Sequence, residues 1–258
     1  MKKYVLDLRV SSVEALSDKH VLIKLTASQA LPDMLPGQFV EVRVDNSPST
    51  FLRRPISICF VDRDSNELWL LVAAIGDGTR QLARLNTGDM VNCVLPLGTS
   101  FSMPASADKK VLLIGGGVGV APLLFWGKAL KDMGCEATFI LGARSAKDVL
   151  LLDEFNKYGR VCVTTEDGCM GERGFVTNHS VLVAEKFDQI GTCGPKPMML
   201  SVARYAHEHQ IMCEVSLENQ MACGLGACLC CVEKTDEGNV CVCKEGPVMN
   251  INRLLWQL

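Results

Sequence analysis

The chain has 258 residues, which is enough for two modest domains and a small additional unit. Hydrophobic residues make up 48% and charged residues 21%, a composition that excludes a disordered protein and is typical of a globular one. The formal net charge of −3 gives no reason to expect nucleic acid as a partner.

The amino terminus contains Asp7 and Arg9, so it lacks the uninterrupted apolar core of a signal peptide. No run approaches the length of about 20 apolar residues that a membrane-spanning helix needs. We therefore expect a cytoplasmic protein without a membrane partner. In that compartment the 13 cysteines would remain mostly thiols, and an odd number of them does not suggest a disulfide framework.

Short apolar runs come first along the chain, at residues 21–25, 38–42, 56–58 and 68–72, and turn residues separate them. Such spacing predicts an antiparallel β-barrel. Buried apolar runs then follow at residues 111–114, 137–141, 161–164 and 189–192, with helical patterns between them. This alternation predicts a parallel α/β sheet with flanking helices. We place three domains at residues 1–104, 105–210 and 211–258.

The last segment contains the most informative motif, a C-x4-C-x2-C pattern that starts at Cys223 and is followed by one more cysteine. This is the spacing by which plant-type ferredoxins hold a [2Fe–2S] cluster. Cys231 is a better third ligand than Cys230, because two residues separate it from Cys228, as the pattern requires, whereas only one residue separates Cys230 from Cys228. Cys241 and Cys243 would point to the same face of a strand, so periodicity does not choose between them.

A glycine-rich loop between a predicted strand and a predicted helix indicates a second kind of site. Backbone N–H groups at a helix start can bind a pyrophosphate when no side chain blocks them. The loop contains Gly115, Gly116, Gly117 and Gly119, but Val120 occupies the third glycine position of the Rossmann pattern. No acidic residue ends the second strand, and Arg144 and Lys147 could meet a 2′-phosphate, so NADP is not excluded. A tight turn without ligand is the structural alternative.

Two further segments are suited to phosphate. The pair Arg53 and Arg54 could form a fork, with Pro55, Ile56 and Ser57 after it. Gly78 and Thr79 open a short predicted helix that Thr79 could cap.

Taken together and in this order, the motifs resemble the ferredoxin–NADP reductase superfamily. Within it, the chain is similar to the electron-transfer subunits of type B dihydroorotate dehydrogenase over essentially its whole length. The resemblance rests on the segments 54–57, 76–79, 115–122, 193–198 and 216–218 and on the cysteine cluster with the sequence after Cys243.

The resemblance implies an FAD-binding barrel, an NAD-binding α/β domain and a C-terminal [2Fe–2S] domain. It assigns the cluster to Cys223, Cys228, Cys231 and Cys243, and NAD to the glycine loop together with Cys193, Gly194 and Pro195. FAD would contact residues 54–57 and Gly78, Thr79, Leu71, Val72 and Ala73. Many relatives have a basic residue where Ala73 stands, and Arg80 could take over its role.

The family also implies a function in pyrimidine biosynthesis. A separate FMN-containing catalytic subunit would oxidise dihydroorotate, and electrons would pass through the cluster and FAD to NAD+. The expected assembly is a heterotetramer of two catalytic and two electron-transfer subunits. Cys193 and Glu218 are the candidate catalytic residues, close to the nicotinamide and the flavin. The alternatives are an inert buried thiol and a surface carboxylate.

Two other functions remain open on the sequence. One is the flavin and iron–sulfur subunit of another NAD(P)H-linked oxidoreductase, such as a ferredoxin:NADP oxidoreductase, a sulfide dehydrogenase or a hydrogenase. The other is an interaction module without enzymatic activity, in which four cysteines hold zinc.

Overall fold

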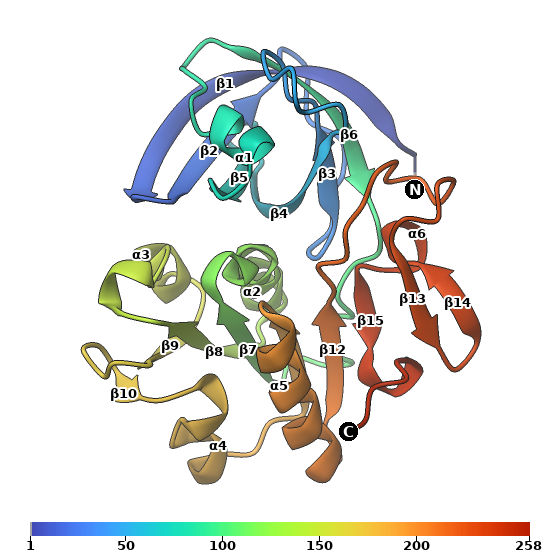
Figure 1. Ribbon diagram of the computed structural model, residues 1–258. Helices are drawn as coiled ribbons and strands as arrows, with labels where there is room; N and C mark the ends of the chain where they lie inside the picture. The colour runs from blue at the N-terminus through green and yellow to red at the C-terminus, as the bar shows by residue number, and fades with distance from the viewer. Residues whose placement is uncertain (1) are drawn as a thin grey trace.

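The computed structural model describes residues 2–258. A six-stranded barrel lies above a seven-stranded sheet with helices on both faces, and a small hairpin unit lies beside them (Figure 1). The architecture confirms the predicted combination of an antiparallel β-barrel and a parallel α/β unit. Among these residues, no helix is long and apolar enough to cross a membrane.

The barrel consists of six antiparallel strands, which close in the order β1-β2-β5-β4-β3-β6. The strands are β1 (Tyr4–Ser17), β2 (His20–Thr26), β3 (Phe39–Val42), β4 (Arg54–Asp62), β5 (Glu67–Ala73) and β6 (Met90–Leu97). The four apolar runs predicted as strands lie in β2, β3, β4 and β5. A short helix, α1 (Asp77–Leu82), follows β5 directly.

Strand β3 shows how the barrel uses its two faces. Val40 and Val42 pack inside the barrel, whereas Phe39 packs in a different cluster that contains residues of the carboxyl-terminal segment. Because successive side chains of a strand point to opposite faces, Glu41 shares the outer face with Phe39. The barrel therefore presents β3 to the cysteine-rich part of the chain.

The large sheet has the strand order β10-β9-β8-β7-β11-β12-β15. All neighbouring strands are parallel except β12 and β15, which pair antiparallel. The strands are β7 (Lys110–Gly116), β8 (Glu136–Ala143), β9 (Arg160–Thr165), β10 (Glu172–Arg173), β11 (Gln189–Cys193), β12 (Met212–Ser216) and β15 (Val248–Asn250). Two strands of this sheet thus come from the part of the chain beyond residue 210.

Helices cover both faces of the sheet. On one face, α2 (Ala121–Met133) and α3 (Leu152–Asn156) pack in a core that also includes outward-facing barrel residues. On the other face, α4 (Val181–Ala184) and α5 (Lys196–Glu208) pack with the carboxyl-terminal segment. Single 3-10 turns precede or follow these elements at η1 (Gly117–Val120), η2 (Ala146–Asp148), η3 (Val176–Asn178) and η4 (Ile251–Arg253).

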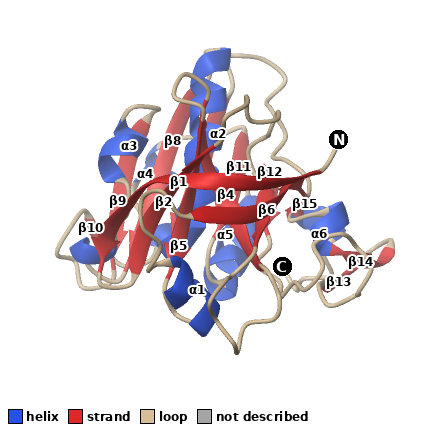
Figure 2. Ribbon diagram, turned by 90° about the horizontal axis from the view of Figure 1, so that it is seen from above, coloured by secondary structure: helices blue, strands red, loops and turns tan. Residues whose placement is uncertain are grey.

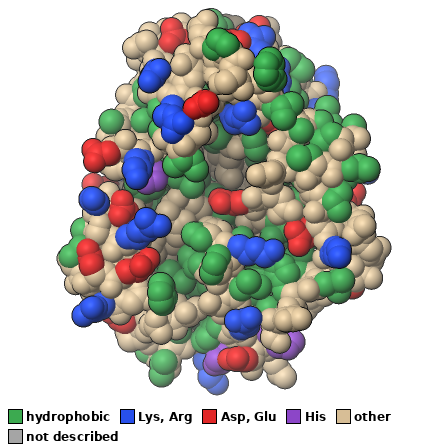
Figure 3. Space-filling view, in the orientation of Figure 1, with side chains coloured by type: hydrophobic (Ala, Val, Ile, Leu, Met, Phe, Trp, Pro, Cys, Tyr) green, Lys and Arg blue, Asp and Glu red, His purple; other side chains and the backbone are tan. Residues whose placement is uncertain are grey.

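The barrel packs firmly on the sheet through aromatic side chains. Phe101, just after the barrel, stacks on Trp126 of α2 with ring centroids 4.4 Å apart. Phe60 of β4 contacts Phe125 of the same helix at 6.1 Å. The arrow of β12 points toward the barrel in Figure 1, so the carboxyl ends of the parallel strands face the barrel. In the space-filling view the surface is hollowed between the two units (Figure 3).

The carboxyl-terminal unit consists of a loop at residues 217–231, the hairpin β13 (Val232–Thr235) and β14 (Gly238–Cys241), and the short helix α6 (Val242–Glu245). It projects from one side of the molecule in the view from above (Figure 2). The chain then returns to the sheet as β15. Thr99 N donates to the Gly246 carbonyl at 2.6 Å and Leu217 N to the Pro247 carbonyl at 2.8 Å, so this return is tied to the segment after the barrel and to the residue that follows β12.

Candidate functional site

The predicted flavin residues gather at one place on the barrel. Residues 54–57 begin β4, residues 71–73 end the neighbouring strand β5, and Gly78 and Thr79 follow in α1. Arg54 lies so close to Gly78 that a Cβ on Gly78 would be 2.6 Å from Arg54 Nε. Among residues 2–258, the Arg54 side chain forms no hydrogen bond or ion pair. Its guanidinium group is therefore available to an anion beside the α1 turn.

The other cations of this region have partners. Arg53 donates to the Asn92 carbonyl at 2.9 Å and to Asn92 Oδ1 at 2.5 Å, so its guanidinium group is already engaged by β6. Arg80 donates to the Ile75 carbonyl at 2.7 Å and pairs with Asp77 at 2.8 Å. Its guanidinium group is thus engaged by residues at the start of α1.

Thr79 stabilises the turn in a different way from the predicted cap. Gly76 is the N-cap residue of α1, and Thr79 occupies the third position of the helix. The Thr79 hydroxyl accepts hydrogen bonds from the N–H groups of Gly76 at 3.1 Å and Ile75 at 3.2 Å. The side chain therefore fixes the backbone that leads into Gly78.

The glycine-rich loop lies at the carboxyl edge of the sheet. Gly115 of β7 pairs with Cys193 of β11, and Cys193 pairs with Ser216 of β12. The loop also touches the end of β11, because a Cβ on Gly119 would be 2.5 Å from the backbone nitrogen of Gly194. The two predicted coenzyme segments thus form one continuous backbone surface at the start of α2, where free N–H groups favour a pyrophosphate.

Cys193 and Glu218 lie together beside this surface. The Cys193 thiol donates to Glu218 Oε1 across 3.8 Å, and Cys193 is completely buried. Burial raises the pKa of Cys193 well above its usual value, and the neighbouring Glu218 carboxyl raises it further. Burial also raises the pKa of Glu218. The pair is therefore a neutral thiol beside a carboxyl group that holds its proton more tightly than usual.

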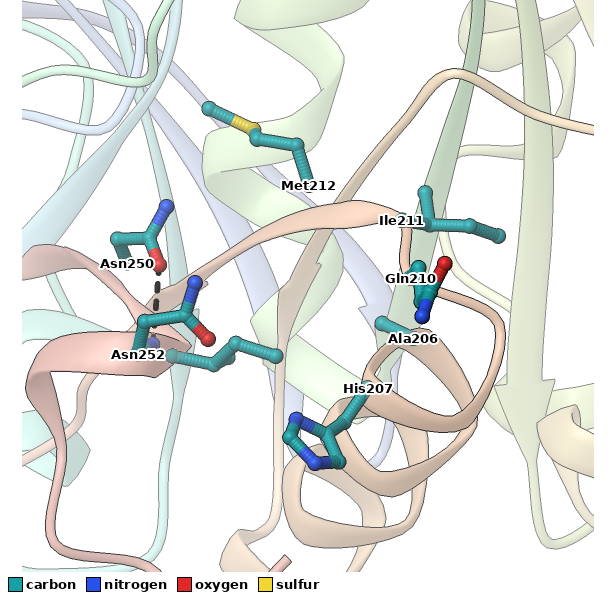
Figure 4. Close-up of a pocket in the computed structure, with 8 residues that line it drawn as sticks. Ala206, His207, Gln210, Ile211, Met212, Asn250 and Asn252 are labelled. Carbon is teal, nitrogen blue, oxygen red and sulfur yellow. Dashed lines mark hydrogen bonds between the residues drawn. The ribbon is translucent and has the colours of Figure 1, made fainter.

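A cavity of about 170 Å³ opens next to this pair and is lined by residues that include Gly194, Lys196, Glu218 and Asn219. A larger cavity of about 520 Å³ lies elsewhere, between the end of α5, the start of β12 and the turn after β15 (Figure 4). His207, Gln210 and Asn252 line the larger cavity. None of the predicted site residues lines it.

The four predicted cluster ligands form two pairs of sulfur atoms. A hydrogen bond from Leu225 N–H is the main reason why the pKa of Cys223 falls to about 6, and the thiol of Cys228 also hydrogen-bonds Cys223. The Cys231 side chain hydrogen-bonds Cys243, whose pKa rises to about 12 mainly through burial. A binuclear cluster takes two thiolates on each iron, so two separate pairs fit it.

The same donor geometry does not fit a single ion. Among residues 2–258, no three His, Cys, Asp or Glu side chains converge to hold one metal ion. A structural zinc site needs four donors around one centre. The two separate sulfur pairs match the two thiolates that each iron of a binuclear cluster takes.

Backbone hydrogen bonds also distinguish the cysteines that are alternative candidates for the third and fourth cluster ligands. The N–H groups of Leu225, Cys243 and Gly226 donate to the sulfur atoms of Cys223, Cys231 and Cys243, at 3.4, 3.3 and 3.1 Å. Such bonds stabilise negative charge on cluster ligands. The Cys241 thiol instead donates to the Gly226 carbonyl across 3.8 Å. Cys230 is exposed, whereas Cys231 is buried, so the geometry favours the pair Cys231 and Cys243.

Comparisons with known proteins agree with this arrangement. Residues 113–204 match the oxidoreductase NAD-binding domain, and residues 218–255 match the iron–sulfur cluster binding domain of dihydroorotate dehydrogenase B. A structure described as an NADH-dependent reduced ferredoxin–NADP oxidoreductase superposes with a TM-score of 0.87 at 27% identity, over 96% of this chain and 90% of the other.

A ferredoxin reductase of carbazole 1,9a-dioxygenase shares the fold, with a TM-score of 0.69 at 20% identity, over 82% of this chain and 67% of the other. Fold and sites thus define an oxidoreductase subunit of the ferredoxin reductase type, with FAD, NAD and iron–sulfur modules. Among sequence relatives, the electron transfer subunit of dihydroorotate dehydrogenase B (NAD(+)) from Listeria monocytogenes serotype 4b is 39% identical, over 96% of this chain and 98% of its own length.

The subunit with the same name from Fusobacterium nucleatum is 38% identical over 83% of this chain and 84% of its own length. This chain belongs to the family of dihydroorotate dehydrogenase B electron transfer subunits.

Proposed function

We propose that this chain carries electrons from an FMN-containing subunit that oxidises dihydroorotate to NAD+, as a step of pyrimidine biosynthesis. The observation that carries the proposal is the position of the cluster loop on the barrel. Gly224, next to Cys223, packs on Glu41 and Leu97, and Glu41 pairs across β3 and β4 with Pro55 of the candidate flavin segment. The start of the cluster loop therefore packs on β3, the strand that pairs with the candidate flavin segment.

Each segment has a distinct task in this proposal. Arg54 and the α1 turn bind the diphosphate of FAD, while residues 55–57 and 71–73 contact the rest of the cofactor. Gly115, Gly116, Gly117 and Gly119 bind the pyrophosphate of NAD. Cys223, Cys228, Cys231 and Cys243 hold a [2Fe–2S] cluster. When bound, the flavin and the cluster supply the conversion between single electrons and a hydride.

Cys193 and Glu218 orient the nicotinamide and control protons near it. The buried thiol stands at the end of β11, in contact with the glycine loop, where the ring of a coenzyme bound along that loop would arrive. Glu218 accepts a hydrogen bond from the thiol, and burial raises the pKa of its carboxyl. Gly194 and Pro195 then shape the backbone beside the nicotinamide.

The proposed assembly is a heterotetramer of two electron-transfer and two catalytic subunits, and the family name supports the existence of the catalytic partner. We place the complex in the cytoplasm, because a reducing compartment keeps cysteines out of disulfides and available to hold a cluster. The domain limits at residues 104 and 210 belong to the same proposal, with β12 and β15 completing the NAD-binding sheet from the last segment.

The test is co-production of the chain with its FMN-containing catalytic subunit, followed by iron and flavin analysis under anaerobic conditions. We expect equimolar FAD, two irons per chain and a visible spectrum that NADH bleaches. Dihydroorotate should bleach it only when the catalytic subunit is present. A colourless, zinc-loaded and folded protein would contradict the proposal. Strong reduction by NADPH, together with capture of a different partner, would favour another oxidoreductase of the same superfamily.

A further inference from the structure

Glu41 is a buried acid for which the proposed function has no task. Its side chain is completely inaccessible to solvent, and neither carboxylate oxygen has a hydrogen-bond partner among residues 2–258. Burying an unpartnered carboxyl group in this way is unfavourable, and a residue of this kind in the middle of an apolar strand calls for a physical explanation.

The side chain lies between the barrel and the cluster loop. Glu41 pairs with Pro55 of β4 on one side and with Val94 of β6 on the other. A Cβ on Gly224 would be 2.7 Å from Glu41 Cγ and 3.0 Å from Oε1, so the loop backbone rests directly on the carboxyl group. Because Gly224 follows Cys223, the acid lies beneath the first segment of the cluster site.

The charges around Glu41 do not neutralise it by a direct ion pair. Burial is the main reason why the pKa of Glu41 rises to about 7, and the charges of Arg53 and Arg54 oppose this rise while Cys223 adds to it. The guanidinium of Arg53 donates to Asn92, and that of Arg54 lies against Gly78. Above that pKa the ionised carboxylate acts over a short distance and through little solvent on whatever charge the cysteine loop carries.

We propose that Glu41 tunes the iron–sulfur cluster by placing a buried negative charge beneath the Cys223–Cys228 loop, which lowers the cluster's reduction potential. The inference rests on the proposed cluster ligands. A negative charge at low dielectric opposes the addition of an electron to a nearby group, so its removal makes reduction easier. Glu41 would thus favour release of electrons from the cluster.

The test is a redox titration of the intact cluster-loaded complex, followed by the EPR signal of the reduced cluster, at pH 8.5. We expect Glu41→Gln to raise the ratio of reduced to oxidised cluster at a fixed potential about tenfold, which corresponds to about 59 mV for one electron. Glu41→Asp keeps the charge and should stay within about threefold of the unaltered protein.

Glu245→Gln is the matched control, because Glu245 is an exposed carboxylate two residues after Cys243. Solvent screens its charge, so we expect no more than a twofold change in the ratio. Glu41→Met offers a second uncharged side chain of similar length, should the glutamine variant fail to fold, since an apolar replacement leaves no unpartnered buried group.

The outcomes separate this inference from the proposed function. If the unaltered protein gives no cluster signal, the cluster assignment itself fails. If the signal is present but Glu41→Gln and Glu41→Met both keep the original midpoint potential, Glu41 does not tune the cluster and the proposed function stands. If Glu41→Asp and Glu41→Gln raise the midpoint potential of the cluster equally, the inference is also overturned, because the effect would then come from side-chain shape and not from charge.

Discussion

Arg54 on β4 covers Gly78 in the first turn of α1, so that the arginine and the helix start form one surface although 24 positions separate them in the sequence. We expect Arg54→Ala to weaken FAD binding about 10- to 100-fold, because a hydrogen bond to a charged group contributes about 1.5–3 kcal/mol. Fluorescence titration of the flavin-free protein with FAD measures this.

Gly78→Ala should weaken FAD binding similarly by displacing the same guanidinium group. Arg43→Ala is the control, since Arg43 forms an exposed ion pair with Asp45 at 2.8 Å, and such pairs contribute little. Unchanged FAD affinity in Arg54→Ala would remove this arginine from the flavin site.

The cysteines give a second prediction. Cys231→Ser and Cys243→Ser should lose the EPR signal of the reduced cluster, because their sulfur atoms form one of the two donor pairs. Cys230→Ser and Cys241→Ser should keep it, and they are the matched controls because each lies near a proposed ligand in the sequence. A normal cluster in Cys231→Ser would defeat the assignment.

Gly119 tests the contact between the glycine loop and β11. An added Cβ would lie 2.5 Å from Gly194 N, and this backbone cannot move aside easily. We expect Gly119→Ala to raise KM for NADH at least tenfold and to lower the free energy of unfolding by about 1–3 kcal/mol. Gly76→Ala should leave KM for NADH unchanged, since its nearest neighbouring atom is 4.0 Å away. Equal effects of the two changes would argue against the contact.

Cys193 is expected to act on turnover more than on coenzyme binding. Cys193→Ala should lower kcat with NADH about 10- to 100-fold, while KM for NADH changes less than threefold, since the thiol orients the ring that reacts. Cys193→Ser should recover part of the rate. Cys59→Ala removes another completely buried thiol and serves as the control. A wild-type kcat in Cys193→Ala would leave the thiol as a packing residue.

The raised pKa of Glu218 predicts a pH dependence of stability. Because the folded state binds this proton more tightly than the unfolded state, its contribution is complete below the ordinary value of 4.5 and is lost as pH rises through the raised pKa. Urea unfolding from pH 5 to 8 should show the free energy of unfolding falling more steeply in the unaltered protein than in Glu218→Gln. Parallel profiles would show that the carboxyl group titrates normally.

Much of the fold could be predicted from the sequence, because apolar runs of strand length mark β2, β5, β7, β8 and β11 directly. The long first strand β1 and the strand β6 that closes the barrel were not predicted. Many β1 side chains are exposed or only partly buried, so the strand lacks a clear apolar alternation. The short strands β10 and β15 have two and three residues, too few for any periodic pattern.

In the candidate site, too, features set by neighbouring residues could be predicted, whereas contacts between residues far apart in the sequence could not. Spacing alone separated Cys231 from Cys230, because neighbouring residues define a ligand loop. The hydrogen bond from Arg53 to Asn92 could not be predicted, because Asn92 is distant in the sequence. Glu41 gave only a weak signal, one charge within an apolar strand, and its burial depends on a loop about 180 positions later.

Strand β15 has a consequence for how this subunit can be divided. It covers the outer edge of β12, and the chain reaches it only after passing through Cys243. A truncation that ends near residue 216 would leave a row of unpaired backbone groups on β12, which promotes aggregation. The metal-binding segment therefore cannot be removed from the rest of the chain. A shortened reductase without it should precipitate, whatever its flavin content.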